Sequence, residues 1–270
     1  MKFFEKELKI IEEEFALGET FRTINRFTAT RLHYLNALKH IIKIKDYETT
    51  NLQKETILSL EKIIYKRITD DYQVVPVKKS TALYKGLSYS AFEIVGKNYC
   101  GTCFLVDHKD NNYYYITNAH VVKNNPSLKI ISNDRLLELD GEVVKMGNLY
   151  DIALVRSKAP TNPYIYLPVA FGNLEELKEG MKISILGNRS GLGLGIITGH
   201  VGSLKGNKLL LDAVTQHGTS GAPVFDEYGF LIGLNCGDTK EIPYALHGKI
   251  IKSFIKPLGL KIREYNQIKY

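Results

Sequence analysis

The sequence predicts a mainly β fold preceded by an α-helical amino-terminal region. Apolar residues recur at helical spacing up to about residue 72, and short apolar runs alternate with turns from residue 81 onward. Many short strands at such spacing are typical of β-barrels or sandwiches rather than of alternating strand–helix folds. We therefore expect a helical accessory region over residues 1–75 and a β domain over residues 81–265.

Two long helices are expected first. One spans residues 3–15 and ends near Gly18, and the next spans residues 20–45. On the second helix, His33 and His40 are interpreted as surface or interhelical polar residues rather than metal ligands. Short connections favour antiparallel neighbours, so these elements predict a helical hairpin or small bundle.

A third helix begins after a turn, where Thr49 or Thr50 is a candidate N-cap and Gln53 completes a capping box. Isolated short helices are marginal in water, so the amphipathic faces of all three must be buried against something. We expect this region to regulate the rest of the chain, or to recruit a partner protein or a second copy.

The β domain is expected to contain strands separated by turns, followed by a short helix over residues 250–257. The expected strands cover residues 91–95, 102–106, 113–118, 128–132, 141–146, 152–155, 181–186, 196–204, 209–211, 224–225 and 230–234.

Ser220 lies in the sequence Gly-Thr-Ser-Gly-Ala-Pro, at a tight turn that leads into a strand. The flanking glycines let the backbone come close to a substrate carbonyl group. The main-chain N–H groups of Gly218 and Ser220 are candidates to bind the oxygen of a tetrahedral intermediate. These features suit a nucleophile.

A histidine and an aspartate accompany this serine: His120 ends Thr-Asn-Ala-His, and Asp151 begins Asp-Ile-Ala-Leu. Taken singly, the three residues can be interpreted as a buried histidine, a strand-end carboxylate and a turn serine. Taken together, their contexts and their order favour a base, an orienting acid and a nucleophile.

These motifs resemble those of the trypsin-like serine peptidases. Residues 185–193 and 197–201 are also similar to a loop and strand of the high-temperature-requirement (Htr/Deg) proteases. The resemblance implies two packed six-stranded antiparallel β-barrels of the chymotrypsin type, with catalytic residues His120, Asp151 and Ser220 between them. It implies hydrolysis of a protein or peptide substrate, with an oxyanion hole of main-chain N–H groups. Such covalent catalysis needs no cofactor, and the sequence suggests neither a cofactor nor a metal.

The same resemblance places five substrate-binding residues by position: Val214, His217, Asn235, Cys236 and Gly237. Val214 stands where trypsins carry the aspartate that selects basic side chains. Asn235 lies near the position where glutamyl endopeptidases use a histidine. A small or medium apolar side chain is therefore the preferred substrate residue.

The three cysteines, Cys100, Cys103 and Cys236, are too few for a disulfide framework and are interpreted as buried thiols. The resemblance places Cys100 at a disulfide position of secreted relatives, but Val121 occupies the partner position. Thr219, directly before Ser220, stands where the resemblance places the aspartate of secreted trypsins that pairs with the newly cleaved amino terminus on activation. Because no apolar run of signal-peptide length follows the amino terminus, a cytoplasmic location is expected.

The composition is that of a soluble globular protein, with 44% hydrophobic and 24% charged residues. No segment has the length of an apolar membrane span. The net charge of +7 comes from scattered Lys and Arg, so a solvated basic surface is preferred over nucleic-acid binding.

Two classes of function remain open. In the first, the chain is an active serine endopeptidase whose helical region controls access, assembly or partner choice. In the second, a catalytically silent protease fold acts as a binding module through its helices. The three motifs favour the first.

Overall fold

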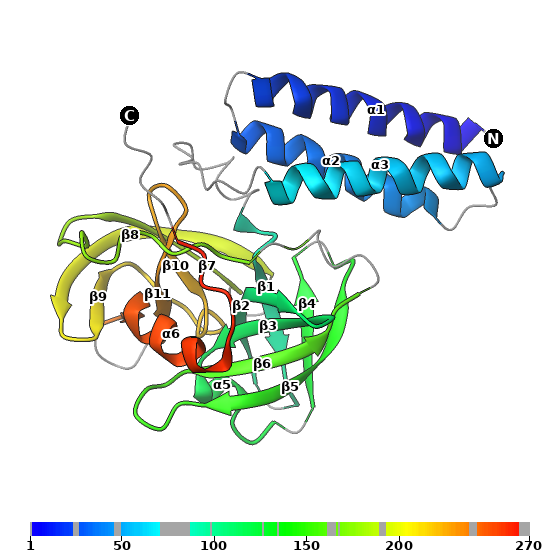
Figure 1. Ribbon diagram of the computed structural model, residues 1–270. Coiled ribbons are helices and arrows are strands. Elements are labelled where there is room, and N and C mark those ends of the chain that lie inside the picture. The colour runs from blue at the N-terminus through cyan, green and yellow to red at the C-terminus, as the bar shows by residue number, and fades with distance from the viewer. Residues whose placement is uncertain are drawn as a thin grey trace. The chain divides into compact units, whose positions relative to one another are not determined.

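The structure is a computed structural model (Figure 1). It describes residues 2–23, 27–45, 50–70, 87–97, 99–125, 127–133, 135–160, 166, 168–188, 193–237 and 242–264. The chain divides into two compact units, Met1–Pro76 and Val77–Tyr270. Within the described ranges, every helix is too short or too polar to cross a membrane.

The first unit consists of α1 (Lys2–Thr23), α2 (Phe27–Lys45) and α3 (Asn51–Asp70), which lie side by side (Figure 1). The capping box expected before α3 is confirmed. The Thr50 N–H donates to Gln53 Oε1 (3.0 Å), and the Gln53 N–H donates to Thr50 Oγ1 (3.3 Å). The buried core of the unit includes Ile11, Tyr34, Leu38, Ile41, Ile57 and Ile64.

The prediction that the first helix ends near Gly18 is wrong, because α1 continues to Thr23, and the second helix begins later than expected, at Phe27. Gly18 lies against the ring of Tyr34 on α2, and a Cβ at Gly18 would overlap that ring. The glycine thus serves the close approach of two helices rather than a helix end.

His33 and His40 face carboxylates on α1, as the interhelical interpretation predicts. His33 Nδ1 lies 2.6 Å from Glu14 Oε2, and His40 hydrogen-bonds to Glu7. The His40 hydrogen bond outweighs the effect of burial and lowers the pKa of Glu7 below its ordinary value. A charged carboxylate is therefore part of the α1–α2 contact.

The second unit contains two closed antiparallel barrels of six strands each, which confirms the predicted fold class. The first barrel has the order β1-β2-β3-β6-β5-β4 and the second has the order β10-β11-β12-β9-β8-β7. The strands are β1 (Ala91–Val95), β2 (Cys100–Lys109), β3 (Asn112–Thr117), β4 (Leu128–Ser132), β5 (Glu138–Met146), β6 (Ala153–Lys158), β7 (Lys182–Asn188), β8 (Leu194–Lys205), β9 (Lys208–Asp212), β10 (Pro223–Asp226), β11 (Leu231–Asn235) and β12 (Tyr244–His247). Sequence patterning missed β12, which has only four residues.

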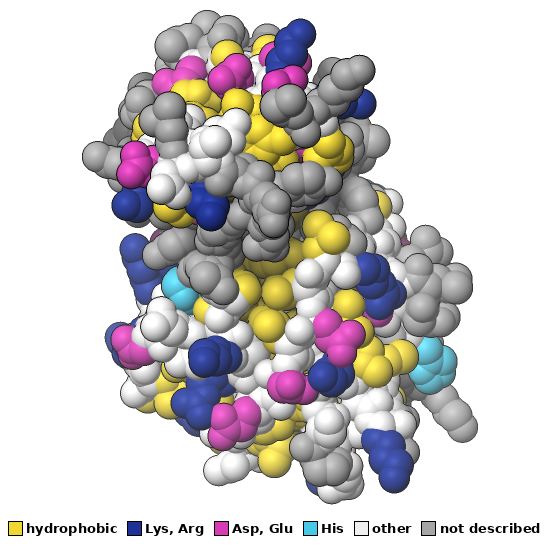
Figure 2. Space-filling view, turned by 90° about the vertical axis from the view of Figure 1, so that its right-hand side faces the viewer, with side chains coloured by type: hydrophobic (Ala, Val, Ile, Leu, Met, Phe, Trp, Pro, Cys, Tyr) yellow, Lys and Arg dark blue, Asp and Glu magenta, His cyan; other side chains and the backbone are white. Residues whose placement is uncertain are grey.

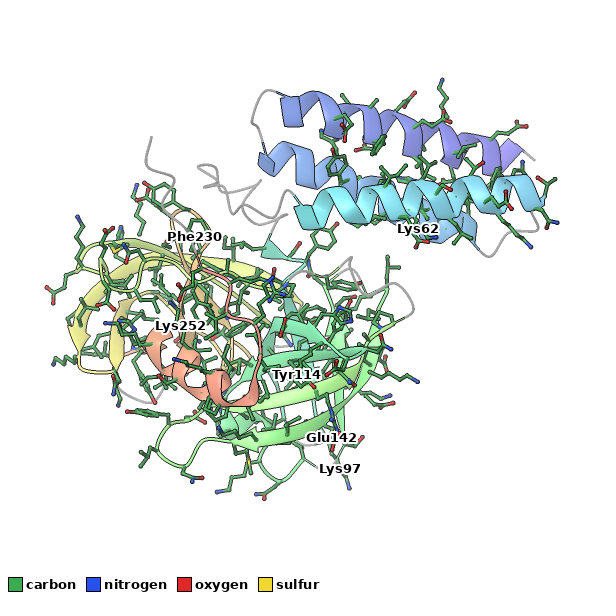
Figure 3. The ribbon with its side chains drawn as sticks, in the orientation of Figure 1. Lys62, Lys97, Tyr114, Glu142, Phe230 and Lys252 are labelled. Carbon is green, nitrogen blue, oxygen red and sulfur yellow. The ribbon has the colours of Figure 1, made fainter. Side chains whose placement is uncertain are left out.

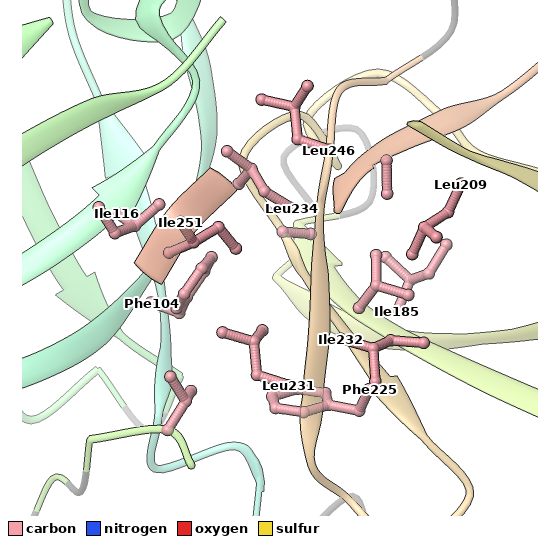
Figure 4. Packing of buried hydrophobic residues seen from close by; sticks show 14 of the residues in the cluster. Phe104, Ile116, Ile185, Leu209, Phe225, Leu231, Ile232, Leu234, Leu246 and Ile251 are labelled. Carbon is pink, nitrogen blue, oxygen red and sulfur yellow. The ribbon is translucent and has the colours of Figure 1, made fainter. Parts of the chain in front are cut away.

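The core of this unit is continuous across the two barrels. Phe104 from the first barrel and Leu231 from the second belong to one buried cluster with Ile251 of α6 (Gly248–Ile255) (Figure 4). After α6, Arg263 Nη2 donates to Asp107 Oδ1 on β2 (3.0 Å). The carboxyl-terminal segment thereby ties the second barrel to the first.

The surface of the barrels carries charges of both signs. Glu142 on β5 pairs with Arg156 on β6 (2.5 Å), and Lys252 on α6 pairs with Glu264 (2.6 Å); Glu142 and Lys252 are labelled in Figure 3. On the face seen in Figure 2, Lys and Arg are interspersed with Asp and Glu. Among the residues that the structure describes, neither sign of charge dominates that face.

Candidate active site

His120 and Asp151 come together at one end of the first barrel. His120 lies on α5 (Ala119–Val122), a single helical turn directly after β3, and Asp151 lies just before β6. Asp151 Oδ1 accepts the main-chain N–H of His120 (2.9 Å), and Asp151 Oδ2 lies 2.6 Å from His120 Nδ1. One carboxylate thus fixes both the helix start and the imidazole ring.

The protonation of this pair follows from its geometry. Burial raises the pKa of Asp151, but the hydrogen bonds and charge of His120 outweigh burial and hold the pKa below its ordinary value. An ionised carboxylate only accepts hydrogen bonds, so Nδ1 of His120 must carry a proton. In the neutral ring, Nε2 is then the basic nitrogen.

Asn118 and Tyr99 support this half of the site, and sequence reasoning assigned no role to either. Asn118 is fully buried, and its Nδ2 donates to the Asp151 carbonyl oxygen (2.8 Å) and to Cys236 Sγ (3.5 Å). The Tyr99 ring meets the His120 ring edge-on, with centroids 5.8 Å apart. The sequence feature that could have indicated a role for Asn118 is its amide side chain directly before Ala119 and His120.

The serine loop belongs to the second barrel and begins with a turn at Gln216. The Thr219 N–H donates to the Gln216 carbonyl oxygen (3.1 Å), and Gly218 has a φ of +87°. This combination is that of a type II turn, which favours glycine at its third position. In a type I turn the central His217–Gly218 peptide would be flipped, so the turn type decides where the Gly218 N–H points.

Two glycines pack tightly around Ser220. Gly221 has a φ of +82°, and a Cβ there would overlap the Thr102 carbonyl oxygen. Gly237 has a φ of +80°, and a Cβ there would overlap Ser220 Oγ. Ser220 is accordingly buried, and Gly237 lies directly against its hydroxyl group. Among the residues that the structure describes, Ser220 Oγ forms no hydrogen bond to His120.

The residues predicted to bind substrate fall into two groups. Val214 and His217 are exposed, with Val214 78% accessible. Asn235, Cys236 and Gly237 are buried, and Asn235 Nδ2 donates to the Thr219 carbonyl oxygen (2.8 Å) beneath the serine loop. Their roles toward substrate stay predictions.

The cysteines are buried or half-buried thiols. Burial, with the nearby Asp151 charge, raises the pKa of Cys236 to about 12, so this thiol stays protonated at neutral pH. The placement of Cys100 opposite Val121 is wrong, because Gly101 occupies that place. A Cβ on Gly101 would lie 2.9 Å from Val121 Cγ1.

No cluster of three or more potential metal ligands occurs within the described ranges of the chain.

The family model of the trypsin-like peptidase domain matches residues 101–234, a span that holds His120, Asp151 and Ser220. This part of the chain is a trypsin-like peptidase domain. A probable periplasmic serine endoprotease, DegP-like, of Brucella suis is 29% identical to the chain over 160 residues, 54% of this chain and 30% of the relative. Serine protease HTRA1 of Xenopus laevis is 30% identical over 154 residues, 52% of this chain and 32% of the relative. The chain spans about a third of the length of these curated relatives.

Among solved structures, an inactive mutant form of Rv3671c from M. tuberculosis H37Rv aligns with a TM-score of 0.56 at 20% identity. The alignment covers 69% of this chain and 97% of that chain, and it shows a shared fold. The resemblance of the peptidase domain to Htr/Deg-type proteases is thus confirmed.

Proposed function

We propose that the chain is a serine endopeptidase that cleaves peptide bonds of protein substrates through an acyl-enzyme. The observation that carries this proposal is the His120–Asp151 pair. Asp151 accepts both the main-chain N–H and the ring N–H of His120, at 2.9 and 2.6 Å. This arrangement leaves Nε2 as the base of an imidazole that is fixed in one tautomer and one orientation.

In the proposed reaction, Ser220 Oγ attacks the carbonyl carbon of the substrate as its proton passes to His120 Nε2. The Gly218 and Ser220 N–H groups bind the oxyanion, and His120 then donates the proton to the leaving amine. A water molecule then attacks the acyl-enzyme carbonyl, with His120 again acting as base and then as acid. This step releases the acyl group and restores the Ser220 hydroxyl. For the initial attack, the Ser220 hydroxyl must turn from Gly237 toward His120. Such a change is expected on substrate binding, because catalytic hydrogen bonds often tighten only then.

A fluorophosphonate probe tests this function. The full chain is expected to be labelled at Ser220, and Ser220→Ala is expected to lose labelling and peptide hydrolysis while keeping its fold. Ser253→Ala, which changes an exposed serine on α6, should retain both. Labelling at another serine in the Ser220→Ala variant would refute the assignment.

The alternative is a catalytically silent protease fold that binds partners through its helices. The position of Ser220 Oγ favours it, because a Cβ at Gly237 would overlap this hydroxyl and, among the described residues, the hydroxyl forms no hydrogen bond to His120. Absence of labelling in a folded full chain would select this alternative.

The unit Met1–Pro76 is proposed to regulate the peptidase domain or to recruit a protein partner or second copy. Residues 75–270, expressed alone, should show raised activity if the helices inhibit, or lost assembly if they dock. Unchanged activity, size and partner binding would refute the proposal. Failure to fold would instead make the helices part of the catalytic core. The expected cytoplasmic location stays a prediction; the Brucella suis relative is named periplasmic.

A further inference from the structure

Thr102 on β2 is fully buried and contacts both residues that carry the proposed oxyanion donors. Its main-chain N–H donates to the Ser220 carbonyl oxygen (2.9 Å), and its hydroxyl donates to the Gly218 carbonyl oxygen (2.8 Å). The same hydroxyl accepts the Asn188 N–H (2.8 Å). Since a threonine hydroxyl has one proton to donate, its donor role is fully used by Gly218.

These bonds cross from one barrel to the other. Thr102 is itself held in the first barrel, where its carbonyl oxygen accepts the Thr117 hydroxyl (2.7 Å). Gly218 and Ser220 belong to the loop of the second barrel. Because a peptide is planar, each of these bonds fixes the peptide that follows its residue and thereby anchors the Cα of Gly218 and of Ser220. The N–H group of each residue projects from the preceding peptide, which ends at that anchored Cα.

We propose that Thr102 is a positioning residue for the oxyanion hole. Its hydroxyl holds Gly218 so that the Gly218 N–H meets the substrate oxygen as negative charge develops. This inference rests on the proposed peptidase function. The main-chain bond to Ser220 can form with any residue except proline at position 102, whereas the bond to Gly218 depends on the hydroxyl.

A positioning role differs from a merely structural one in the step that it affects. An oxyanion donor acts on the transition state more than on the bound substrate, so its misplacement lowers kcat and leaves KM nearly unchanged. A general loss of packing would lower the stability of the chain without this selective effect. Substitution of Thr102 by its isostere valine separates the two because it removes the hydroxyl and keeps the shape.

The test compares Thr102→Val, Thr102→Ser and the parent in the full chain, with a fluorogenic peptide substrate. Thr102→Val is expected to lose about tenfold to a hundredfold in kcat with KM within about twofold. Thr102→Ser should stay within about threefold of the parent in kcat, because it keeps the hydroxyl. Ser157→Ala, which removes a buried hydroxyl elsewhere in the first barrel, should leave kcat unchanged. The proposal is overturned if Thr102→Val keeps the parent kcat, or if Thr102→Ser loses as much as Thr102→Val.

Should Thr102→Val fail to fold, Thr102→Ser and Thr102→Cys replace the comparison, since they differ only in oxygen against sulfur. A thiol is a weak donor, so the cysteine variant should have the lower kcat; equal values would overturn the proposal. Fluorophosphonate labelling of the parent at Ser220 keeps the two proposals distinct. An unlabelled, inactive parent overturns both, whereas a labelled parent with unchanged variants overturns only the role of Thr102.

Discussion

The two halves of the candidate active site are held in place by different means. In the first barrel, His120 is fixed by the Asp151 carboxylate, and the Asn118 side chain donates to the main-chain carbonyl oxygen of Asp151. In the second barrel, the serine loop depends on backbone conformation, with positive φ values at Gly218 and Gly221. One half is defined by side-chain chemistry and the other by main-chain geometry.

This difference predicts two kinds of response to substitution. In the first barrel, a change that preserves shape but alters hydrogen-bonding chemistry should be most damaging. In the second barrel, a change that adds a Cβ should be most damaging, even though it adds no polar group. The predictions below test this contrast, from the largest expected effect to the smallest.

Asp151→Asn preserves shape and is expected to lower kcat by about 10⁴-fold. An asparagine amide N–H can donate a hydrogen bond to Nδ1 and thereby favour the tautomer with the proton on Nε2, in which Nε2 is unable to act as a base. Peptidase assays of the purified full chain measure the effect. Asp140→Asn, which changes an exposed carboxylate paired with Lys129, should keep the parent kcat. An unchanged rate in Asp151→Asn would mean that another group orients His120.

Gly218→Ala adds one methyl group and is expected to lower kcat by about a hundredfold, with a smaller effect on folding. Alanine disfavours φ of +87°, so the turn should shift toward type I and flip the His217–Gly218 peptide. The control is Gly206→Ala, since Gly206 also has a positive φ, of +60°, and nothing lies within 4 Å of a Cβ there. It should cost similar backbone strain and no activity. Equal kcat losses in both variants would contradict the role of turn geometry.

The same distinction between local pattern and three-dimensional contact separates what the sequence predicted of the fold from what it missed. The alternation of short apolar runs and turns predicted eleven strands of the β domain, because each run buries one face against a neighbour. It missed Tyr244–His247, which leads directly into α6 at Gly248 without a turn to mark its end. Gly18 was misjudged because its contact with Tyr34 joins residues that are distant in sequence. Patterns within one segment predict elements better than they predict the contacts between elements.

At the candidate site, the sequence indicated His120, Asp151 and Ser220 because their residue types and local contexts are informative. It gave no indication of Thr102, whose role depends on bonds to Gly218, Ser220 and Asn188, all more than 80 positions away. A threonine in a strand has no pattern that distinguishes such a residue from an ordinary core position. Contacts of this kind become visible only once the barrels are assembled.

Asn118→Ala tests the hydrogen bond that holds the Asp151 main chain next to the first barrel, and it is expected to lower kcat by about tenfold. The substitution removes the donor to the Asp151 carbonyl oxygen, so the carboxylate loses one constraint on its position. Steady-state kinetics on the peptide substrate measure the loss. The matched control is Asn125→Ala, which removes a buried amide that donates to the Val121 carbonyl oxygen (3.0 Å). A comparable loss of kcat in both variants would point to general weakening of the segment.

Asp151 beside the first barrel and Asp226 in the second have pKa values shifted in opposite directions. Asp151 has a histidine partner and a lowered pKa, so its contribution to stability is lost as pH falls. Asp226, the last residue of β10, has main-chain donors instead. Its Oδ1 accepts the N–H groups of Tyr228 and Phe230, both at 2.9 Å (Phe230 is labelled in Figure 3). Burial outweighs these bonds and raises the pKa of Asp226 to about 6.

The last prediction follows from that raised pKa. Between about pH 4, where an unfolded aspartate titrates, and pH 6, the folded chain binds more protons at Asp226 than the unfolded chain. Stability should therefore fall as pH rises through this window, by at most about 3 kcal/mol for a shift of about two pKa units.

Asp226→Asn keeps the Oδ1 acceptor and removes the charge, so it should be more stable than the parent by about 1–3 kcal/mol at pH 8 and lose this advantage near pH 4. Hydrogen exchange of the β10–β11 amides, measured at both pH values, reports the free energy of opening, and kcat should be unchanged. The same change at the exposed Asp212 should be neutral at both pH values. A stability advantage of Asp226→Asn that is equal at pH 4 and pH 8 would show that charge burial is not its cause.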